Sequence, residues 1–303
     1  MKNLTAAIYV KSGQEHHVHW TDAFSEGLMR HGIRVRKLEY QPEKIESADI
    51  HVFWAMKASK VIRHCREYGQ PIVCLERGYT DDRMSVTSIN LNGLNGMSEL
   101  DVSSFSNDNS RCQMHGWRIR ERKTHGENII ISGQVAGDAS LNGIDIYDWV
   151  NAQVSALKAL GLGDRILFKP HPLETAPNLH RIQNVEVEKL ICSMGDAYEL
   201  AKIFLTYSST VGGDAWRYGV PALAASPTSM IYQDQFGGNT PCAKQKWLNR
   251  ISFRQFNEQE FRSGDVWDLH ADRIIGQAPR QNLELTPSQQ PVVERAEKSG
   301  LFL

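Results

Sequence analysis

The stretch RILFKPHP, residues 165–172, places a lysine and a histidine directly after a short apolar run. The run is typical of a buried strand, and residues that follow the carboxyl end of a parallel strand enter the ligand crevice of an open α/β sheet. The two prolines fix the backbone and exclude a helix, so they hold Lys169 and His171 in an extended geometry. A cation beside an imidazole donor suits a phosphate or a pyrophosphate. The alternative is a solvated turn that happens to contain both residues.

A second stretch, TYSSTVGGDAWRYGVPAL at 206–223, has the same organisation. An apolar strand ends at Ser208–Thr210 and a helix begins at once, so hydroxyls and free backbone N–H groups converge at the positive end of a helix dipole. Gly212 and Gly213 would let a ligand approach the backbone closely. The alternative is that Ser209 only caps the helix. Because both stretches follow strand ends in one domain, together they predict one phosphate-binding crevice.

The rest of the chain predicts an α/β protein, since short apolar runs alternate with amphipathic stretches. The expected strands are 5–10, 33–38, 48–54, 71–75, 128–132, 165–168, 185–187, 203–206 and 221–225, and the expected helices are 20–31, 58–68, 144–160, 197–202, 211–218, 267–276 and 291–298. Residues 76–127 are expected to be rich in loops, which favours a functional role. We expect two Rossmann-like domains, 1–125 and 126–265, and a helical tail, 266–303, that packs back toward the first domain.

The strand-KPHP motif, followed about 35–40 residues later by strand-SSTVGxxAxxxGVP, resembles the carboxyl-terminal half of GT-B glycosyltransferases. It is most similar to the capsular polysaccharide type, which includes Kdo transferases and glycerophosphotransferases of wall polymers. The resemblance covers roughly residues 125–235 and implies two Rossmann-like domains that face a cleft. It also implies that His171, Ser208, Ser209 and Thr210 hold the phosphates of the donor nucleotide. The family usually has Glu-Ala in the helix after the serines, whereas this chain has a shorter carboxylate, Asp214, before Ala215.

The stretch Ser12–Trp20 lies between the first expected strand and helix, where the resemblance implies an acceptor-side base. Glu15 or His17, with Asp82 in reserve, is expected to take the proton from the acceptor hydroxyl, because a histidine titrates near neutrality and a buried glutamate can be shifted toward it. Three histidines and a glutamate in five positions could also bind a divalent metal. We expect no metal and no cofactor, because the spacing is loose and GT-B catalysis needs neither. The alternative is a solvated loop.

Charged residues follow the run PIVCL at 71–75, and dense charge after a buried strand is costly unless it is paired or meets a ligand. The acceptor-side candidates are Glu76, Arg77 and Arg83, together with His19. An ion pair between Glu76 and an arginine is the alternative. The Asn-Gly repeats of NLNGLNG, residues 90–96, favour tight turns.

From ERGY and NGLNG, the first half is similar to glycosyltransferase-like proteins of phages, which implies a modified DNA base as a possible acceptor. The basic cluster Arg118–Lys123, next to Trp117, could follow a polyanion backbone, and a solvated surface is the alternative.

Composition limits the function classes. The chain has 34 Lys and Arg residues against 35 Asp and Glu, a formal net charge of −1, which argues against bulk electrostatic coating of nucleic acid. No apolar run approaches the roughly 18–20 residues of a membrane span. The start of the chain turns polar too soon for a signal peptide, and the five cysteines are scattered, as in a reducing compartment. We expect a soluble cytoplasmic protein, located in the host cytoplasm if a phage encodes it.

These observations predict a glycosyltransferase that moves a sugar from a nucleotide-sugar donor to an acceptor hydroxyl, with inversion at the anomeric carbon. The acceptor would be a glycan or a hydroxymethylated base in DNA. Two alternatives stay open: a nucleotide-sugar epimerase of GT-B shape, and a binding module without catalytic activity.

Overall fold

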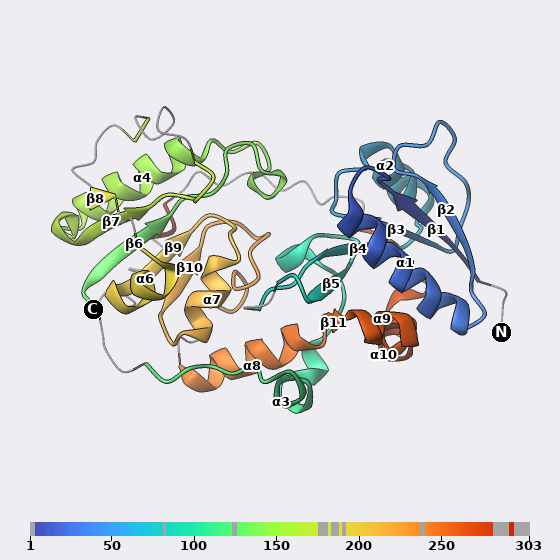
Figure 1. Cartoon of the computed structure of the whole chain (residues 1–303). Coiled ribbons are helices and arrows are strands. Elements are labelled where there is room, and N and C mark those ends of the chain that lie inside the picture. Colours follow the sequence, from blue (N-terminus) through green and yellow to red (C-terminus); the bar gives the residue numbers. More distant parts are fainter. Residues whose placement is uncertain are drawn as a thin grey trace. The chain divides into compact units, whose positions relative to one another are not determined.

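The computed structural model describes residues 4–80, 83–122, 126–174, 181–182, 188–189, 192–236, 240–280 and 291–293. The chain forms two compact units (Figure 1). Unit 1 comprises Met1–Arg111 with Asn249–Glu284, and unit 2 comprises Cys112–Leu248 with Leu285–Leu303. The chain therefore passes from unit 1 to unit 2 between residues 111 and 112 and returns to unit 1 between residues 248 and 249. From the sequence we expected domain boundaries near residues 125 and 265.

Unit 1 is built on a sheet of order β11-β5-β4-β3-β1-β2 in the described part of the chain. Its strands are β1 (Thr5–Val10), β2 (Arg34–Glu39), β3 (Ile50–Trp54), β4 (Ile72–Arg77), β5 (Val86–Leu91) and β11 (Gln255–Asn257). The first four are parallel, while β5 runs antiparallel to β4 and β11 antiparallel to β5. From β1 the chain goes to β2 on one side and then to β3 on the other, so the direction of winding reverses between β1 and β3.

The helices of unit 1 are α1 (Glu15–Arg30), α2 (Ser59–Tyr68), α9 (Glu258–Ser263) and α10 (Asp265–Ile274), with 3₁₀ turns η1 (Asn95–Met97) and η2 (Ser103–Phe105). Helix α1 buries Trp20, Phe24 and Leu28 in the core, at a spacing of four residues that puts them on one face. Each such side chain contributes about 1.5–3 kcal/mol when fully buried. The sequence placed the helix start at Trp20, which is wrong, because α1 already begins at Glu15.

The strand β5 lies within residues 76–127, which were expected to be rich in loops, and no strand was predicted there. Thr87, Ser88 and Asn90 are fully buried in it, so its polar composition hides the strand from an apolar-pattern search. Ser88 Oγ donates a hydrogen bond to the carbonyl of Glu76 at 3.1 Å, which explains why this polar side chain tolerates burial. The Asn-Gly turns occur as expected, since Asn92 and Asn95 both have positive φ angles.

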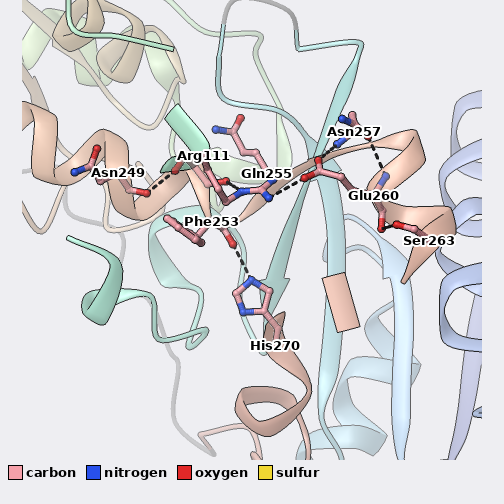
Figure 2. Close-up of polar contacts among 9 residues, drawn as sticks. Arg111, Asn249, Phe253, Gln255, Asn257, Glu260, Ser263 and His270 are labelled. Atoms are coloured by element: carbon pink, nitrogen blue, oxygen red, sulfur yellow. Dashed lines mark hydrogen bonds and ion pairs between the residues drawn. The ribbon is translucent and has the colours of Figure 1, made fainter. Parts of the chain in front are cut away.

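The segment that returns to unit 1 after Asn249 is fixed by a buried polar network (Figure 2). Arg111 donates to Glu260 Oε1 at 2.7 Å and to the carbonyl oxygens of Ser252 and Gln255 at 3.0 and 2.6 Å. Asn257 and Glu260 form a capping box that starts α9. The sequence ended the strands at 221–225, and β11 shows that this was wrong.

Unit 2 contains a parallel sheet of order β10-β9-β6-β7-β8 in its described residues, and Figure 1 shows the strands side by side. The strands are β6 (Asn128–Ser132), β7 (Ile166–Lys169), β8 (Glu188–Lys189), β9 (Ala201–Thr206) and β10 (Ala222–Ala224). The helices are α3 (Ser110–His115), which begins at the end of unit 1, α4 (Ile146–Ala159), α6 (Met194–Leu200), α7 (Val211–Arg217) and α8 (Pro241–Ser252), with 3₁₀ turns η3 (Ala139–Leu141) and η4 (Gly163–Arg165).

The core of unit 2 forms where α4 covers the sheet. Trp149, Val150 and Leu157 of the helix are essentially inaccessible and pack in one cluster with Ile131 and Leu205 of the strands. The expected helix at 144–160 and the expected strands at 128–132 and 203–206 correspond to these elements. The strand expected at 185–187 and most of the helix expected at 291–298 lie outside the described residues.

Candidate functional site

The loops that leave β6, β7 and β9 meet at the carboxyl edge of the unit 2 sheet. Strand β6 lies between the other two, and Ser132, its last residue, is in register with Lys169 of β7. From β6 the chain passes to β7 and β8 on one side, and it then returns to β9 and β10 on the other. Open α/β sheets bind ligands where the winding reverses in this way, so the β6/β9 edge is the expected binding position of this unit.

Gln134 bridges this edge. Its Nε2 donates to Ser208 Oγ at 2.9 Å and to Ser140 Oγ at 2.6 Å, and its Oε1 lies 3.2 Å from Ser208 Oγ. Gln134 and Ser208 are 8% and 5% exposed, so the bridge is shielded from water. The sequence analysis missed Gln134 and Ser140, although Gln134 follows the apolar run NIIIS just as the other candidates follow theirs.

His171 borders the same loop from the side of β7. A Cβ placed on Gly133 would lie 3.3 Å from the backbone nitrogen of His171, so the histidine loop adjoins the residue next to Gln134. Its Nδ1 accepts the backbone N–H of Leu173 at 3.1 Å, which leaves Nε2 as the protonated nitrogen of the neutral ring. Burial lowers the pKa of His171, while Glu174 and Asp138 oppose that change.

Lys169 is directed at a backbone acceptor. Its Nζ donates to the carbonyl of Cys192 at 2.6 Å. A phosphate would have to share this ammonium group with the carbonyl. The role of Lys169 in phosphate binding therefore stays a prediction.

The start of α7 is arranged by local hydrogen bonds. Ser209 Oγ accepts the backbone N–H of Val211, the first residue of α7, at 3.3 Å, from one position before the N-cap residue. Thr210 is the N-cap residue and makes no side-chain hydrogen bond to the helix. Both side chains are half-buried.

The glycines of α7 face packed side chains. A Cβ on Gly212 would lie 3.0 Å from Ile231 Cδ1, and one on Gly213 would lie 3.1 Å from the Trp247 ring. Close packing gives both positions a structural reason for glycine, and their role in admitting a ligand stays a prediction. Asp214 Oδ1 lies 3.9 Å from Arg217 Nη1, so this carboxylate faces a buried guanidinium.

In unit 1, the histidines of Ser12–Trp20 belong to the first turns of α1. His17 stacks on Trp54 at 5.0 Å between ring centroids, and His16 meets the same indole edge-on at 5.2 Å. Burial, reinforced by His16 and nearby cations, lowers the pKa of His17 to about 4. The expectation that His17 titrates near neutrality is therefore wrong. Glu15 is exposed, and Asp82 lies outside the described residues.

His19 lies apart from that cluster, in an open groove of about 770 Å³. Its Nε2 lies 3.1 Å from Glu258 Oε2. The groove is lined by His19, Trp20, Arg30, Met84, Ser85, Asn257, Glu258, Gln259, Arg262 and Ser263. Sequence reasoning missed Glu258, because nothing local connects it with a histidine 239 residues earlier in the chain.

The acceptor-side charges lie at the end of β4. Glu76 and Arg77 belong to the strand itself, and Glu76 Oε1 accepts the backbone N–H of Arg77 at 2.8 Å. The Arg77 guanidinium contacts Met84 Sδ at 3.2 Å, and Met84 lines the groove. Arg83 Nε donates to the carbonyl of Gly78 at 3.0 Å. The structure thus brings Arg77 to the groove and uses Arg83 to fix the loop.

The basic cluster is engaged within unit 2. Arg120 lies over the Tyr218 ring at 4.0 Å, and Arg122 donates to the carbonyl oxygens of Ala201 and Tyr198. These contacts explain two of the arginines without a polyanion. Arg118 is exposed, and Lys123 lies outside the described residues.

Within the described part of the chain, no three His, Cys, Asp or Glu side chains are grouped so as to hold a metal ion. Over the same residues, no helix combines the length and apolar character that a membrane crossing requires.

Two Rossmann-like units, each with polar groups at the carboxyl edge of its sheet, define the GT-B fold of glycosyltransferases and related epimerases. The solved β-Kdo 2,4 transferase of KpsC from Thermosulfurimonas dismutans superposes with a TM-score of 0.55 and 15% identity, over 83% of this chain and 91% of that one. The β-Kdo 2,7 transferase of the same KpsC gives a TM-score of 0.53 and 14% identity, over 89% and 99%.

The UDP-GlcNAc 2-epimerase of Methanocaldococcus jannaschii, solved with UDP-GlcNAc and UDP, gives a TM-score of 0.33 and 9% identity, over 89% of this chain and 99% of that one. No family model matches the chain, and no curated protein matches it in sequence. The likeness to the Kdo transferases establishes the fold.

Proposed function

We propose that this protein is a glycosyltransferase that uses a nucleotide-sugar donor. One observation carries the proposal: the loops after β6, β7 and β9 converge on the β6/β9 edge, where the buried bridge between Gln134 and Ser208 fixes the loops beside the Nε2–H donor of His171. The edge lies where the winding of the sheet reverses, which is the position for a nucleotide in open α/β sheets. The fold shared with the two Kdo transferases is consistent with this use.

The chemistry requires stabilisation of a leaving phosphate. When the acceptor oxygen attacks the anomeric carbon, the bond from that carbon to the phosphate oxygen breaks and negative charge develops on the nucleotide. The Nε2–H of His171 and the hydroxyl groups of Ser209 and Thr210 would donate to that charge, and such preorganised donors are worth several kcal/mol, about 3–4 kcal/mol for one donor. Single displacement of this kind inverts the anomeric carbon.

The acceptor hydroxyl needs a base, and the pair His19–Glu258 in the groove of unit 1 fits this role. Glu258 accepts from Nε2 and so leaves Nδ1 of His19 to take the proton. His17, with a pKa of about 4, is a weaker base at neutral pH. Glu15 stays the alternative carboxylate base, because it is exposed in the first turn of α1.

The test is turnover with CMP-, UDP-, GDP- and ADP-sugars, and with a nucleotide-activated Kdo because the structural neighbours are Kdo transferases. Mass spectrometry of the products detects sugar transfer to oligosaccharide acceptors. We expect His171→Ala and His19→Gln to lower turnover at least about tenfold, whereas His115→Ala, a variant outside the site, leaves it unchanged. Turnover by none of the donors, or equal turnover in all three variants, overturns the proposal.

Two further measurements in the same experiment test the alternative functions, an epimerase and a transferase that acts on DNA. Isomerisation of the donor without any acceptor would identify an epimerase instead. A hydroxymethylated DNA acceptor, compared with plain DNA, examines the DNA reading, which also predicts salt-sensitive duplex binding. The contacts of Arg120 and Arg122 within unit 2 lead us to propose a glycan as the acceptor.

A further inference from the structure

Cationic side chains gather at the carboxyl edge of the unit 1 sheet, and none of them takes part in the reaction steps proposed above. Lys11 directly follows β1, Lys57 follows β3 after two further residues, and Arg77 is the last residue of β4. These strands are neighbours in the order β4-β3-β1, so their carboxyl ends lie side by side. The winding of the chain reverses between β1 and β3, which makes this edge the expected ligand position of unit 1.

Helix α1 starts at the same edge. Its N-cap residue, Gln14, makes no side-chain hydrogen bond to the helix, so no side chain caps the N–H groups of the first turn. The positive end of a helix of this length attracts an anion. The indole of Trp54 lies beneath it, stacked on His17 and edge-on to His16.

His17 supplies an observation independent of the helix end. The side chain is 9% exposed, and its Nδ1 is buried with no hydrogen-bond partner among the residues that the structure describes. A buried polar atom left in this state costs about 1–3 kcal/mol. Burial, His16, Lys11, Arg77 and Lys57 all act to lower the pKa of His17, which shows that these cationic groups are near the ring.

Among the described residues at this edge, the carboxylates of Glu15 and Glu76 stand against three cations. Glu15 is exposed at the first turn of α1, and the Glu76 carboxylate accepts the backbone N–H of Arg77. Tyr40 donates its hydroxyl to the carbonyl of Trp54, and burial raises its pKa to about 12, so it stays neutral. An incoming anion would complete the charge balance of the edge.

We propose that this edge of unit 1 is a binding site for an oxyanion, the phosphate or carboxylate group of a ligand. Lys11, Lys57 and Arg77 supply the charge, the start of α1 supplies backbone donors, and Trp54 with the two histidines forms the floor. Arg77 also contacts Met84, which lines the neighbouring groove, so one ligand could place its anionic group here and its neutral part there. The site belongs to unit 1 and is distinct from the donor site in unit 2.

The test is an NMR titration of the His16 and His17 ring signals in the whole chain, assigned with His16→Gln and His17→Gln. It uses the His171→Ala background, so that phosphate binding in unit 2 is weakened. Inorganic phosphate, glycerol 3-phosphate and glucuronate are the probes, and glucose is the neutral control. We expect an anion to raise the pKa of His17 from about 4 to about 5 or above, because an opposite charge favours the imidazolium. The stronger response, to the phosphates or to glucuronate, identifies the source of the oxyanion.

A matched pair of lysine variants locates the effect. Lys57 and Lys60 are both exposed and near the start of α2, so neither substitution removes core packing. We expect Lys57→Ala to weaken anion binding at least about threefold and Lys60→Ala to leave it unchanged. Ring signals that no anion moves, or equal affinities in the two lysine variants, overturn the proposal.

Discussion

Gln134 Nε2 donates to Ser208 Oγ at 2.9 Å, across the two strands between which the winding of the unit 2 sheet reverses. The two residues are 74 positions apart in the chain, and both are almost fully buried. This contact fixes the loop after β6 against the loop after β9. Since Gly133 lies against His171, the same short loop borders both segments that the sequence had singled out.

Gln134→Ala tests whether this bridge organises the donor site. The substitution removes a donor and an acceptor from buried Ser208, which we expect to cost about 1–3 kcal/mol of stability and about tenfold in nucleotide-sugar affinity. Gln153→Ala is the matched control, because Gln153 is a buried glutamine of unit 2 that accepts the N–H of Val292 at 2.8 Å. Calorimetric titration of both variants should show weakened binding in the first alone. Equal loss in both would assign Gln134 a purely structural role.

The protonation of His171 predicts a pH-dependent donor affinity. Burial holds its pKa below the ordinary value of 6.5, and a bound phosphate should raise it. Affinity should therefore increase as pH falls from about 8 to about 5.5, and binding should take up a proton within that window. The diester phosphates of a nucleotide sugar do not titrate there. Calorimetry in two buffers of different ionisation heat measures the uptake, and a pH profile in His171→Ala as steep as in the wild type would refute the assignment.

The parts of the fold that the sequence predicted are those built from apolar runs. Strands β6, β7 and β9 carry Ile, Leu and Phe in uninterrupted order, and the segments that follow them became the candidate site. Strand β5 was not predicted because its buried residues Thr87 and Ser88 are polar and of types that are common in loops. Strand β11 was not predicted because its three residues form a strand only by pairing with β5, which lies more than 150 positions earlier in the chain.

Site residues were predictable to the extent that they follow a strand. His171 and Ser208 satisfied that rule, and Gln134 would have been found by applying it to NIIIS as well. The contact of Lys169 with the Cys192 carbonyl and the pair His19–Glu258 depend on tertiary packing, which no local pattern records.

The ion pair between Arg111 and Glu260 predicts a large loss of stability when it is broken. The two side chains are 12% and 10% exposed, so Arg111→Met leaves a buried carboxylate without its partner and should cost about 3–5 kcal/mol. Arg262→Met is the control, because its pair with Glu258 is considerably more exposed and should cost about 1 kcal/mol or less. Urea unfolding compares the two. Similar costs would show that the network in Figure 2 does not fix the returning segment.

Buried histidines of unit 1 predict a loss of stability in mild acid. Burial lowers the pKa of both His51 and His270 to about 4, so between about pH 6.5 and pH 4 the unfolded chain binds more protons than the folded one. The free energy of unfolding should fall as pH drops through this window, by up to roughly 3 kcal/mol for each histidine. His270→Gln should flatten the decline, because it removes one of the two buried rings. Unchanged pH dependence in His270→Gln, measured by urea unfolding, would count against this cause.

Hydrogen exchange with and without a nucleotide sugar tests the donor site most directly, because it reports where the ligand binds without requiring turnover. We expect slowed exchange at the backbone amides of 133–140, 171–174 and 207–212, the three loops at the β6/β9 edge, for at least one of the CMP-, UDP-, GDP- and ADP-sugars. We also expect this protection to disappear in His171→Ala at the same ligand concentration. Protection that avoids these loops, or that His171→Ala leaves intact, would contradict the assignment of the donor to unit 2.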